Sequence, residues 1–419
     1  MHGSFDPAAA TQAYVATMSP AAQAKAIAYT HQQHWLLLGG AAVGVLVALL
    51  ILKSGLLRRA QAALEARRAR PALTSFLLPL LFLVLSSLLF LPWSAYAGWW
   101  VERGFAMTSQ PFTGWLSEYL ISATLSSVFG AMLFCAIYAL IRRAGRAWPL
   151  FAGAVVLVFA GMALVAGPIY IEPLFNTYTP APNGPVRDAV VQLAKANAVP
   201  SDKIFIYNGS KQSNRYTANV SGLFGSARVA MSDVMFAKGA DISEVRGVVG
   251  HEMGHYVHQH ALWMVAEVGA LAVLLFWLAD IVFPMCARWM GARGVGSITD
   301  PAGFPVVMAI MTVLQLVTTP VMNSFTRYTE ADADRFSLAR AHEPDGLSKA
   351  LIKTADYRAP SPGRIEEILF YDHPSVSWRI RQAMNWKTAH LDISAAQAQQ
   401  DAAIAAGSDP AQAPATATK

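Results

Sequence analysis

Long apolar segments separated by short polar ones occupy much of this 419-residue chain. A helix needs about 20 apolar residues to cross the hydrocarbon core of a bilayer, and six segments approach or exceed that length. The pattern therefore predicts a mainly α-helical polytopic membrane protein with about six transmembrane helices. The six predicted spans are residues 35–52, 72–93, 119–141, 147–169, 261–283 and 304–322.

The segment 170–260 has a different pattern, in which polar and apolar residues mix and Pro and Gly recur. Asp241 and Glu244 have capping-box spacing, which indicates the start of a helix. We expect a water-facing region with a small β element here. Its predicted elements are a helix at 186–196, a strand at 203–207, a hairpin of 216–222 and 227–231 around 223–226, and a helix at 241–260 that leads into the fifth span.

These patterns divide the chain into six parts. The last part is rich in Ala, Gln, Asp and Pro, and we expect it to be disordered. The parts are an N-terminal tail (1–34), four spans (35–169), the region with the β element (170–260), two spans (261–325), a helix with a C-terminal segment (326–393) and the disordered tail (394–419).

Composition supports a membrane protein and excludes several other classes. Hydrophobic residues make up 54% of the chain and charged residues 14%, whereas a soluble domain has about 25% charged residues. Disordered, nucleic-acid-binding and disulfide-scaffold proteins are excluded, and an ordinary cytosolic enzyme is disfavoured. The net charge of +6 reflects basic residues clustered beside the spans, so we expect a lipid bilayer and no nucleic acid as a partner.

The sequence H-E-M-G-H at 251–255 carries the strongest chemical signal. Positions i and i+4 share one face of a helix, so His251 and His255 can bind one ion. Glu252 lies beside the first of them, where it can accept a proton from a water on that ion, as in metalloproteases. A chance pattern on a surface helix is the alternative for so short a motif.

A catalytic zinc takes three protein ligands and keeps one position open. Glu330, at the end of the sixth span, is the candidate third ligand for one Zn2+ ion. Asp334 lies one turn later on the same face, where its carboxylate can accept the free N–H of a ligand histidine. The alternative is that these acidic residues only solvate a helix end, which is the role assigned to Asp332 on another face.

Two further histidines follow the motif. His258 lies on a similar face to His251, but three imidazoles of one helix would crowd a single ion, so we expect a supporting or solvated role. His260 precedes the fifth span and is interpreted as a marker of the membrane interface.

His373 and Arg379, in H-P-S-V-S-W-R, are candidate donors to an oxyanion. The alternative is that they are ordinary surface residues.

Together these motifs resemble the integral-membrane zinc metalloendopeptidases of the CAAX prenyl protease type 1 family. H-E-M-G-H with His260 is similar to the family's H-E-x-G-H-x(4)-H, and its E-x-x-x-D and H-P…R patterns recur at 330–334 and 373–379. Three other segments are similar to family segments. They are L-P-W-S-A-Y at 91–96, E-R-G-F at 102–105 and E-P-L-F-N at 172–176.

The resemblance implies a zincin-like (gluzincin) catalytic region and assigns a role to each candidate residue. The implied roles are zinc ligation by His251, His255 and Glu330, proton transfer by Glu252, orientation of a ligand by Asp334, and contact with the transition state by His373 and Arg379.

The stretch T-A-N-V-S-G at 217–222 departs from the family pattern. The family usually has Asn-Ala before its edge strand, whereas Thr217 stands at that Asn position and Asn219 lies two residues on. An exposed strand edge can still pair with an extended peptide through backbone hydrogen bonds. The residues expected to contact substrate are Thr217, Ala218, Asn219, Val220 and Gly222.

We therefore expect a membrane-embedded zinc metalloendopeptidase. It would hydrolyse peptide bonds of peptide or membrane-protein substrates, among them CAAX-type C-termini, with Glu252 activating a water on zinc. One alternative is a non-catalytic scaffold or transporter with a structural metal site closed by His258 or His260. Another is a peptidase that uses cobalt or manganese. The sequence carries no signal for an oligomeric state.

Two considerations disagree on the side of the membrane that holds the catalytic region. Arginine-rich loops at 54–71, 142–146 and 284–302 lie on one side, so positive-inside counting places 170–260 and both termini outside the cytoplasm. The family resemblance implies a cytoplasmic catalytic side. We expect a multi-pass protein of the cell membrane, and a reporter active on one side only, fused after Ile393, distinguishes the two orientations.

Overall fold

The computed structural model describes residues 5–222 and 227–406, and most of them are helical. Six helices in this part of the chain are long and apolar enough to cross a membrane. They confirm the six predicted spans, although each helix extends beyond its predicted limits. These candidate spans are Pro20–Ser54, Pro71–Gly104, Phe112–Arg143, Gly145–Leu174, His260–Trp289 and Pro301–Ala341.

The spans pack around an apolar core and present other apolar side chains outward. Phe304 contacts the rings of Phe82 and Phe134 at centroid distances of 5.1 and 4.6 Å. Trp289 and Val317 are among many large apolar residues left exposed, as expected for helices that face lipid. The main helices of this part are α2 (Pro20–Ser54), α3 (Leu56–Glu65), α4 (Pro71–Ala95), α5 (Glu102–Gly104), α6 (Phe112–Arg143), α7 (Trp148–Ala166), α11 (His260–Trp289) and α12 (Phe304–Ala341).

A small sheet forms the centre of the region that the sequence predicts to face water, with strand order β1-β2-β4-β3. Strands β2 and β4 run parallel, and β3 pairs antiparallel with β4, which confirms the predicted hairpin strands; residues 223–226 between them lie outside the described residues. Strand β1 was not predicted, because it has only three residues and includes Pro180. The strands are β1 (Tyr178–Pro180), β2 (Ile204–Tyr207), β3 (Ala218–Ser221) and β4 (Arg228–Ser232).

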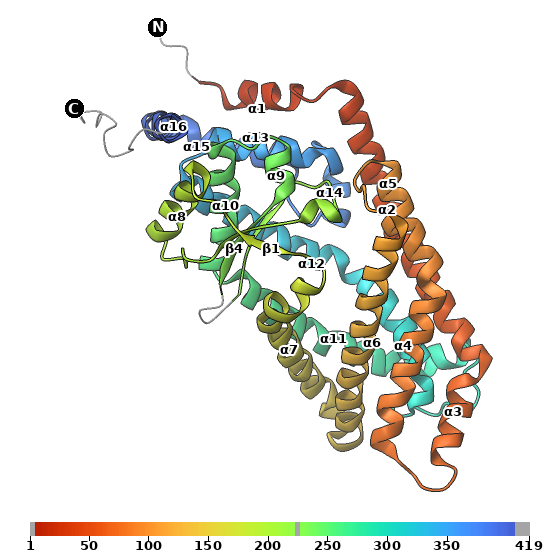
Figure 1. Cartoon of the computed structure of the whole chain (residues 1–419). Coiled ribbons are helices and arrows are strands. Elements are labelled where there is room, and N and C mark those ends of the chain that lie inside the picture. Colours follow the sequence, from red (N-terminus) through yellow and green to blue (C-terminus); the bar gives the residue numbers. More distant parts are fainter. Residues whose placement is uncertain (1–4, 223–226, 407–419) are drawn as a thin grey trace.

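Helices pack beside this sheet and join it to the spans (Figure 1). Helix α12 begins among the spans and continues into the water-facing region, where α10 packs on it. Met231, Val249 and Met253 are completely buried between the sheet and α10. The helices of this region are α8 (Pro185–Ala196), α9 (Asp233–Ala237), α10 (Ile242–Val257), α13 (Pro344–Thr354), α14 (Arg364–Phe370), α15 (Val376–Ala389) and α16 (Leu391–Ala405).

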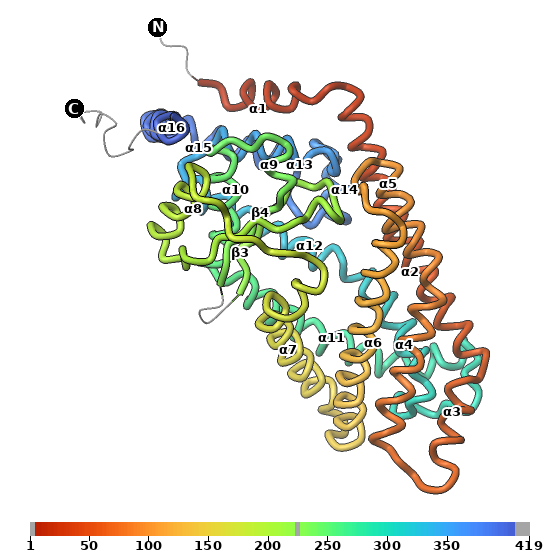
Figure 2. Tube along the Cα trace, viewed as in Figure 1, coloured from red at the N-terminus to blue at the C-terminus, as the bar shows by residue number. Residues whose placement is uncertain are grey.

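Both ends of the described chain differ from the expected tails. Residues 7–16 form α1 (Pro7–Ala16), and α2 already begins at Pro20. Figure 2 shows α1 lying across the C-terminal helices, and Tyr14 donates a hydrogen bond to Asp345 at 2.7 Å. The expectation of disorder from residue 394 is wrong for residues 394–405, which belong to α16; residues 407–419 lie outside the described residues.

Two predicted connections also differ. The second span was predicted to end at residue 93, but its helix continues through residue 104. The predicted helix 241–260 does not pass smoothly into the fifth span. It ends at Val257, and Gln259 adopts a left-handed conformation with φ of 55° before α11 begins at His260.

Candidate metal centre

Helix α10 carries the H-E-M-G-H motif and lies very close to α12. Asp241 caps its start by accepting a hydrogen bond from the Glu244 amide at 2.8 Å, as the predicted capping spacing requires. A Cβ atom at Gly254 would lie 3.0 Å from both Ala333 Cα and Phe336 Cβ. Because glycine has no side chain, the two helices approach closely enough for the motif to face residue 330.

The two motif histidines and Glu330 converge on one point. The Nε2 atoms of His251 and His255 are 3.1 Å apart. Glu330 Oε2 lies 3.2 Å from His251 Nε2, and Oε1 lies 3.3 Å from His255 Nε2. Around a tetrahedral zinc with bonds of about 2.0–2.1 Å, neighbouring ligand atoms lie about 3.3 Å apart. The three side chains therefore have the spacing of one metal site.

The burial of Glu330 tests this fit independently. Its side chain is 8% exposed, and Oε2 is buried without a hydrogen-bond partner among the described residues. A buried carboxylate oxygen without a partner is costly. A cation held between the carboxylate and the two imidazoles removes that cost, so the residues present fit a metal ion.

Asp334 supports the site from the side opposite the ion. Its Oδ1 lies 2.9 Å from His251 Nδ1, so it can accept the Nδ1 proton and leave Nε2 free for the metal. Arg379 donates from Nε and Nη2 to the two oxygens of Asp334, both at 2.7 Å. All three side chains are buried. This network fixes the orientation of His251.

Glu252 lines a cavity of about 190 Å³ together with the three candidate ligands His251, His255 and Glu330. Burial raises the pKa of Glu252, and the positive charges of His251 and His255 offset only part of that rise. A carboxylate with a raised pKa is a better proton acceptor, as a general base requires.

His373 reaches the same cavity from the segment before α15. Its Nε2 lies 3.3 Å from Glu330 Oε1, and its Nδ1 lies 2.8 Å from Asp372 Oδ1. Burial and the charge of Arg358 lower the pKa of His373. Arg379 also lines the cavity, but two of its nitrogens are already bonded to Asp334, so its first role is to hold that carboxylate.

The predicted substrate strand lies at the edge of the sheet. Thr217 and Ala218 line the metal cavity. Asn219 pairs with Ala230 of β4, and its side-chain Oδ1 is buried without a partner among the described residues. Val220 packs against the core beneath the sheet, and Gly222 has a φ of 104°. Only the first two of these five residues therefore line the cavity.

The structure assigns contacts that the sequence analysis did not. Asp332 is more than a solvated residue, since it contacts His258 and His260. His260 Nδ1 lies 2.9 Å from His255 Nδ1. Arg358 lines the metal cavity and an adjacent cavity of about 560 Å³. The sequence motifs assigned no partner to these residues, because their contacts join different elements.

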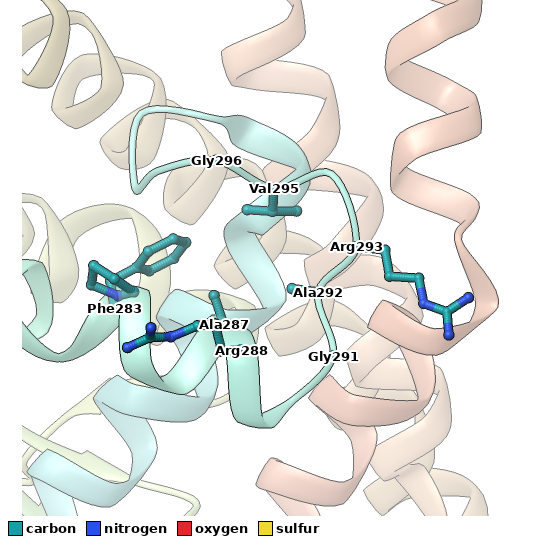
Figure 3. A pocket seen from close by; sticks show the side chains of 9 residues that line it. Phe283, Ala287, Arg288, Gly291, Ala292, Arg293, Val295 and Gly296 are labelled. Atoms are coloured by element: carbon teal, nitrogen blue, oxygen red, sulfur yellow. The ribbon is translucent and has the colours of Figure 1, made fainter.

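A separate cavity of about 460 Å³ lies at the other end of α11 (Figure 3). It is lined by apolar residues, including Phe283 and Val295, and by two arginines. Arg288 and Arg293 extend in different directions. None of its lining residues is a histidine or an acid, and along helix α11 its nearest lining residue, Phe283, lies about 35 Å from His260 at 1.5 Å per residue. It is therefore distinct from the metal centre.

Two family sequence models match this chain. The model described as peptidase family M48 matches residues 180–387, which include all the metal-centre residues. The model described as CAAX prenyl protease N-terminal, five membrane helices, matches residues 8–177. The described residues of that range contain four of the six candidate spans.

Individual proteins are similar over most of their length. The "Uncharacterized metalloprotease YhfN" of Bacillus subtilis (strain 168) is 25% identical over 369 residues, 87% of this chain and 86% of that protein. A "CAAX prenyl protease 1 homolog" of Arabidopsis thaliana is 25% identical over 295 residues, 70% and 69%. The crystal structure of S. mikatae Ste24p has the same fold, with a TM-score of 0.65, 24% identity and coverage of 76% of this chain and 77% of that one.

Proposed function

The chain belongs to peptidase family M48 as a CAAX prenyl protease-type membrane metalloprotease, and we propose that it is a zinc endopeptidase whose base is Glu252. One observation carries this proposal. The Nε2 atoms of His251 and His255 lie 3.1 Å apart, each lies 3.2–3.3 Å from one oxygen of Glu330, and Glu252 lines the same cavity.

The donor set favours zinc. Two imidazoles and one carboxylate form a frequent catalytic zinc site that keeps a position open. When bound, zinc polarises the carbonyl of the scissile peptide bond and makes water more acidic. His251, His255 and Glu330 would hold the ion, and Asp334 would keep His251 in the tautomer that binds through Nε2.

The other side chains of the cavity have separate roles in hydrolysis. Glu252 accepts the proton of the attacking water and later delivers it to the leaving amine. The Nε2 atom of His373 faces the first cluster. When this nitrogen carries a proton, it can donate to the oxyanion that forms as water attacks the peptide carbonyl. Arg379 acts mainly by positioning Asp334, and its charge adds to the positive potential of the cavity.

The substrate is proposed to be an extended peptide that adds to the free edge of β3. Thr217 and Ala218, at the start of this strand, line the cavity that contains Glu252. Peptides and membrane proteins both fit this arrangement. The relatives named CAAX prenyl protease 1 homolog suggest C-terminal CAAX-type segments as one substrate class.

A non-catalytic structural site is disfavoured. Closing the site would require a fourth protein ligand, for which His258 and His260 were the candidates. His258 contacts Asp332 instead, and His260 approaches Nδ1 of His255 rather than the metal-binding Nε2. The position beside Glu252 therefore stays open to water and substrate.

The test is a comparison of cleavage and zinc content in Glu252→Gln and wild type. Purified protein in lipid vesicles is given an unfolded protein substrate, and bound zinc is measured by mass spectrometry. We expect the variant to retain one zinc and to lose about 10²–10⁴-fold in rate. Glu65→Gln, on the remote helix α3, is the control and should cleave normally. Unimpaired cleavage by Glu252→Gln would contradict the mechanism.

Comparison of protein C-termini in cells that carry wild type or Glu252→Gln then identifies the substrate. CAAX-type C-termini that stay uncleaved in the variant would establish that class. Changes confined to other peptides would exclude it.

A further inference from the structure

A second cluster of metal-binding side chains lies beside the first. His258 and His260 flank Gln259, whose left-handed φ of 55° ends α10 and begins α11. Both imidazoles face Asp332 of α12. His258 Nδ1 contacts Asp332 Oδ2, and His260 Nε2 lies 3.3 Å from the same oxygen. The three ligand atoms lie within 4.8 Å of one another.

The cluster is arranged to receive an ion from solvent. The side chain of His258 is 39% exposed, whereas that of His260 is 8% exposed. Arg335 donates to Asp332 Oδ1 at 2.9 Å, so Oδ2 alone is directed at both imidazoles. Phe336 packs against the His258 ring at a centroid distance of 5.4 Å. Two imidazoles and a carboxylate suit zinc and neighbouring transition metals.

His260 connects this cluster to the proposed catalytic site. When His255 binds a metal through Nε2, its Nδ1 carries the proton and donates to His260 Nδ1, 2.9 Å away. Neutral His260 then has its own proton on Nε2, where it donates to Asp332. In this state His260 and Asp332 support His255 much as Asp334 supports His251.

An ion in the second cluster requires the opposite arrangement. A metal on His260 Nε2 displaces the proton from that atom. Neutral His260 then carries its proton on Nδ1, facing the Nδ1 proton of His255, and two donors at 2.9 Å repel each other. The hydrogen bond that supports His255 is lost.

We propose that His258, His260 and Asp332 form a second site for divalent zinc whose occupation weakens the catalytic metal and inhibits the peptidase. This inference rests on the proposed function, because it assigns a regulator to the same catalytic site. Coupling between two sites is reciprocal, so zinc in either site lowers the zinc affinity of the other, typically by about 5–150-fold. Zinc would therefore activate at low concentration and inhibit at higher concentration.

The test uses His258→Gln in the full-length protein. Of the two clusters, His258 contacts members of the second, so the variant keeps the link from His255 through His260 to Asp332. Zinc binding to metal-depleted protein is measured by equilibrium dialysis, and peptide cleavage is followed as zinc is raised. His31→Gln replaces another exposed histidine near a carboxylate and serves as the control.

We expect wild type and His31→Gln to bind two zinc ions and to lose activity as the second binds. His258→Gln should bind one ion with unchanged affinity, keep full activity, and need at least tenfold more zinc for inhibition. Equal inhibition of His258→Gln and wild type would overturn the proposal, as would a single bound zinc in wild type. Two bound ions without any cleavage would contradict the proposed function instead.

Discussion

Two clusters of similar composition lie side by side on the same elements, yet their surroundings differ. Each takes two histidines from the α10 motif or the turn after it and one carboxylate from α12. Glu330 of the first cluster is buried, with an oxygen that lacks a partner among the described residues. Asp332 of the second bonds to Arg335 at the surface. The same ligand types can therefore lie in a buried environment or in an accessible one.

The first cluster also has three features that the second lacks. Glu252, the proposed general base, shares its cavity. A buried pair, Asp334 and Arg379, orients one ligand. A sheet edge runs beside it, with Thr217 in the same cavity. These surroundings, more than the ligand types, distinguish the proposed site of peptide hydrolysis from the proposed second ion site.

Exchanging one carboxylate for an amide in each cluster gives the largest expected contrast. Glu330→Gln removes a charged ligand and leaves a buried amide between two imidazoles, so zinc should no longer bind at one equivalent. The rate of cleavage should fall by at least about 10³-fold, since zinc supplies the main electrostatic stabilisation. Asp332→Asn should keep one tightly bound zinc. Metal analysis and cleavage assays check this, and equal effects of the two substitutions would contradict the difference between the clusters.

A substitution that separates α10 from α12 should have a smaller effect, chiefly on stability and zinc binding. In Gly254→Ala the new methyl group would lie 3.0 Å from Ala333 Cα, so the helices must separate, at a cost of about 1–3 kcal/mol. We expect a lower thermal unfolding temperature in detergent and weaker zinc binding. Gly161→Ala on α7 is the matched control, because no atom lies within 4 Å of its added Cβ. Equal stability of the two variants would show that the approach is not tight.

The pH dependence of cleavage should show the smallest effect, and it tests the role of Glu252 alone. Glu252 must be ionised to accept a proton, and burial raises its pKa. As pH falls, kcat/KM should therefore begin to fall at a pH above the ordinary glutamate value of about 4.3, and then by about tenfold per unit. His258→Gln should show the same acidic limb. A limb at or below the ordinary value would contradict the role of Glu252.

Much of this arrangement follows from local sequence. Apolar run length indicates the six spans, and the i, i+4 spacing places His251 and His255 on one face of α10. Glu330 was predicted as third ligand because it lies in a motif at the end of a span. The structure brings its carboxylate within 3.3 Å of both imidazoles.

Other features depend on distant contacts that no local pattern records. Asp332 lies two residues from Glu330, so the helix turns it to another face, and its partners depend on the conformation of Gln259. Helix α16 looks like a polar tail, but Gln397 and Asp401 are buried near Arg246. The sequence pattern predicts such elements poorly because their stability comes from docking rather than from their own apolar face.

The most direct test of the central claim is X-ray absorption at the zinc edge of purified wild-type protein loaded with one equivalent of zinc. We expect one bound ion with two imidazole nitrogens and one carboxylate oxygen at about 2.0–2.2 Å, and Glu330→Gln should lose this tightly bound ion together with its spectrum. Protein that binds no zinc, or a wild-type spectrum unchanged by Glu330→Gln, would contradict the account.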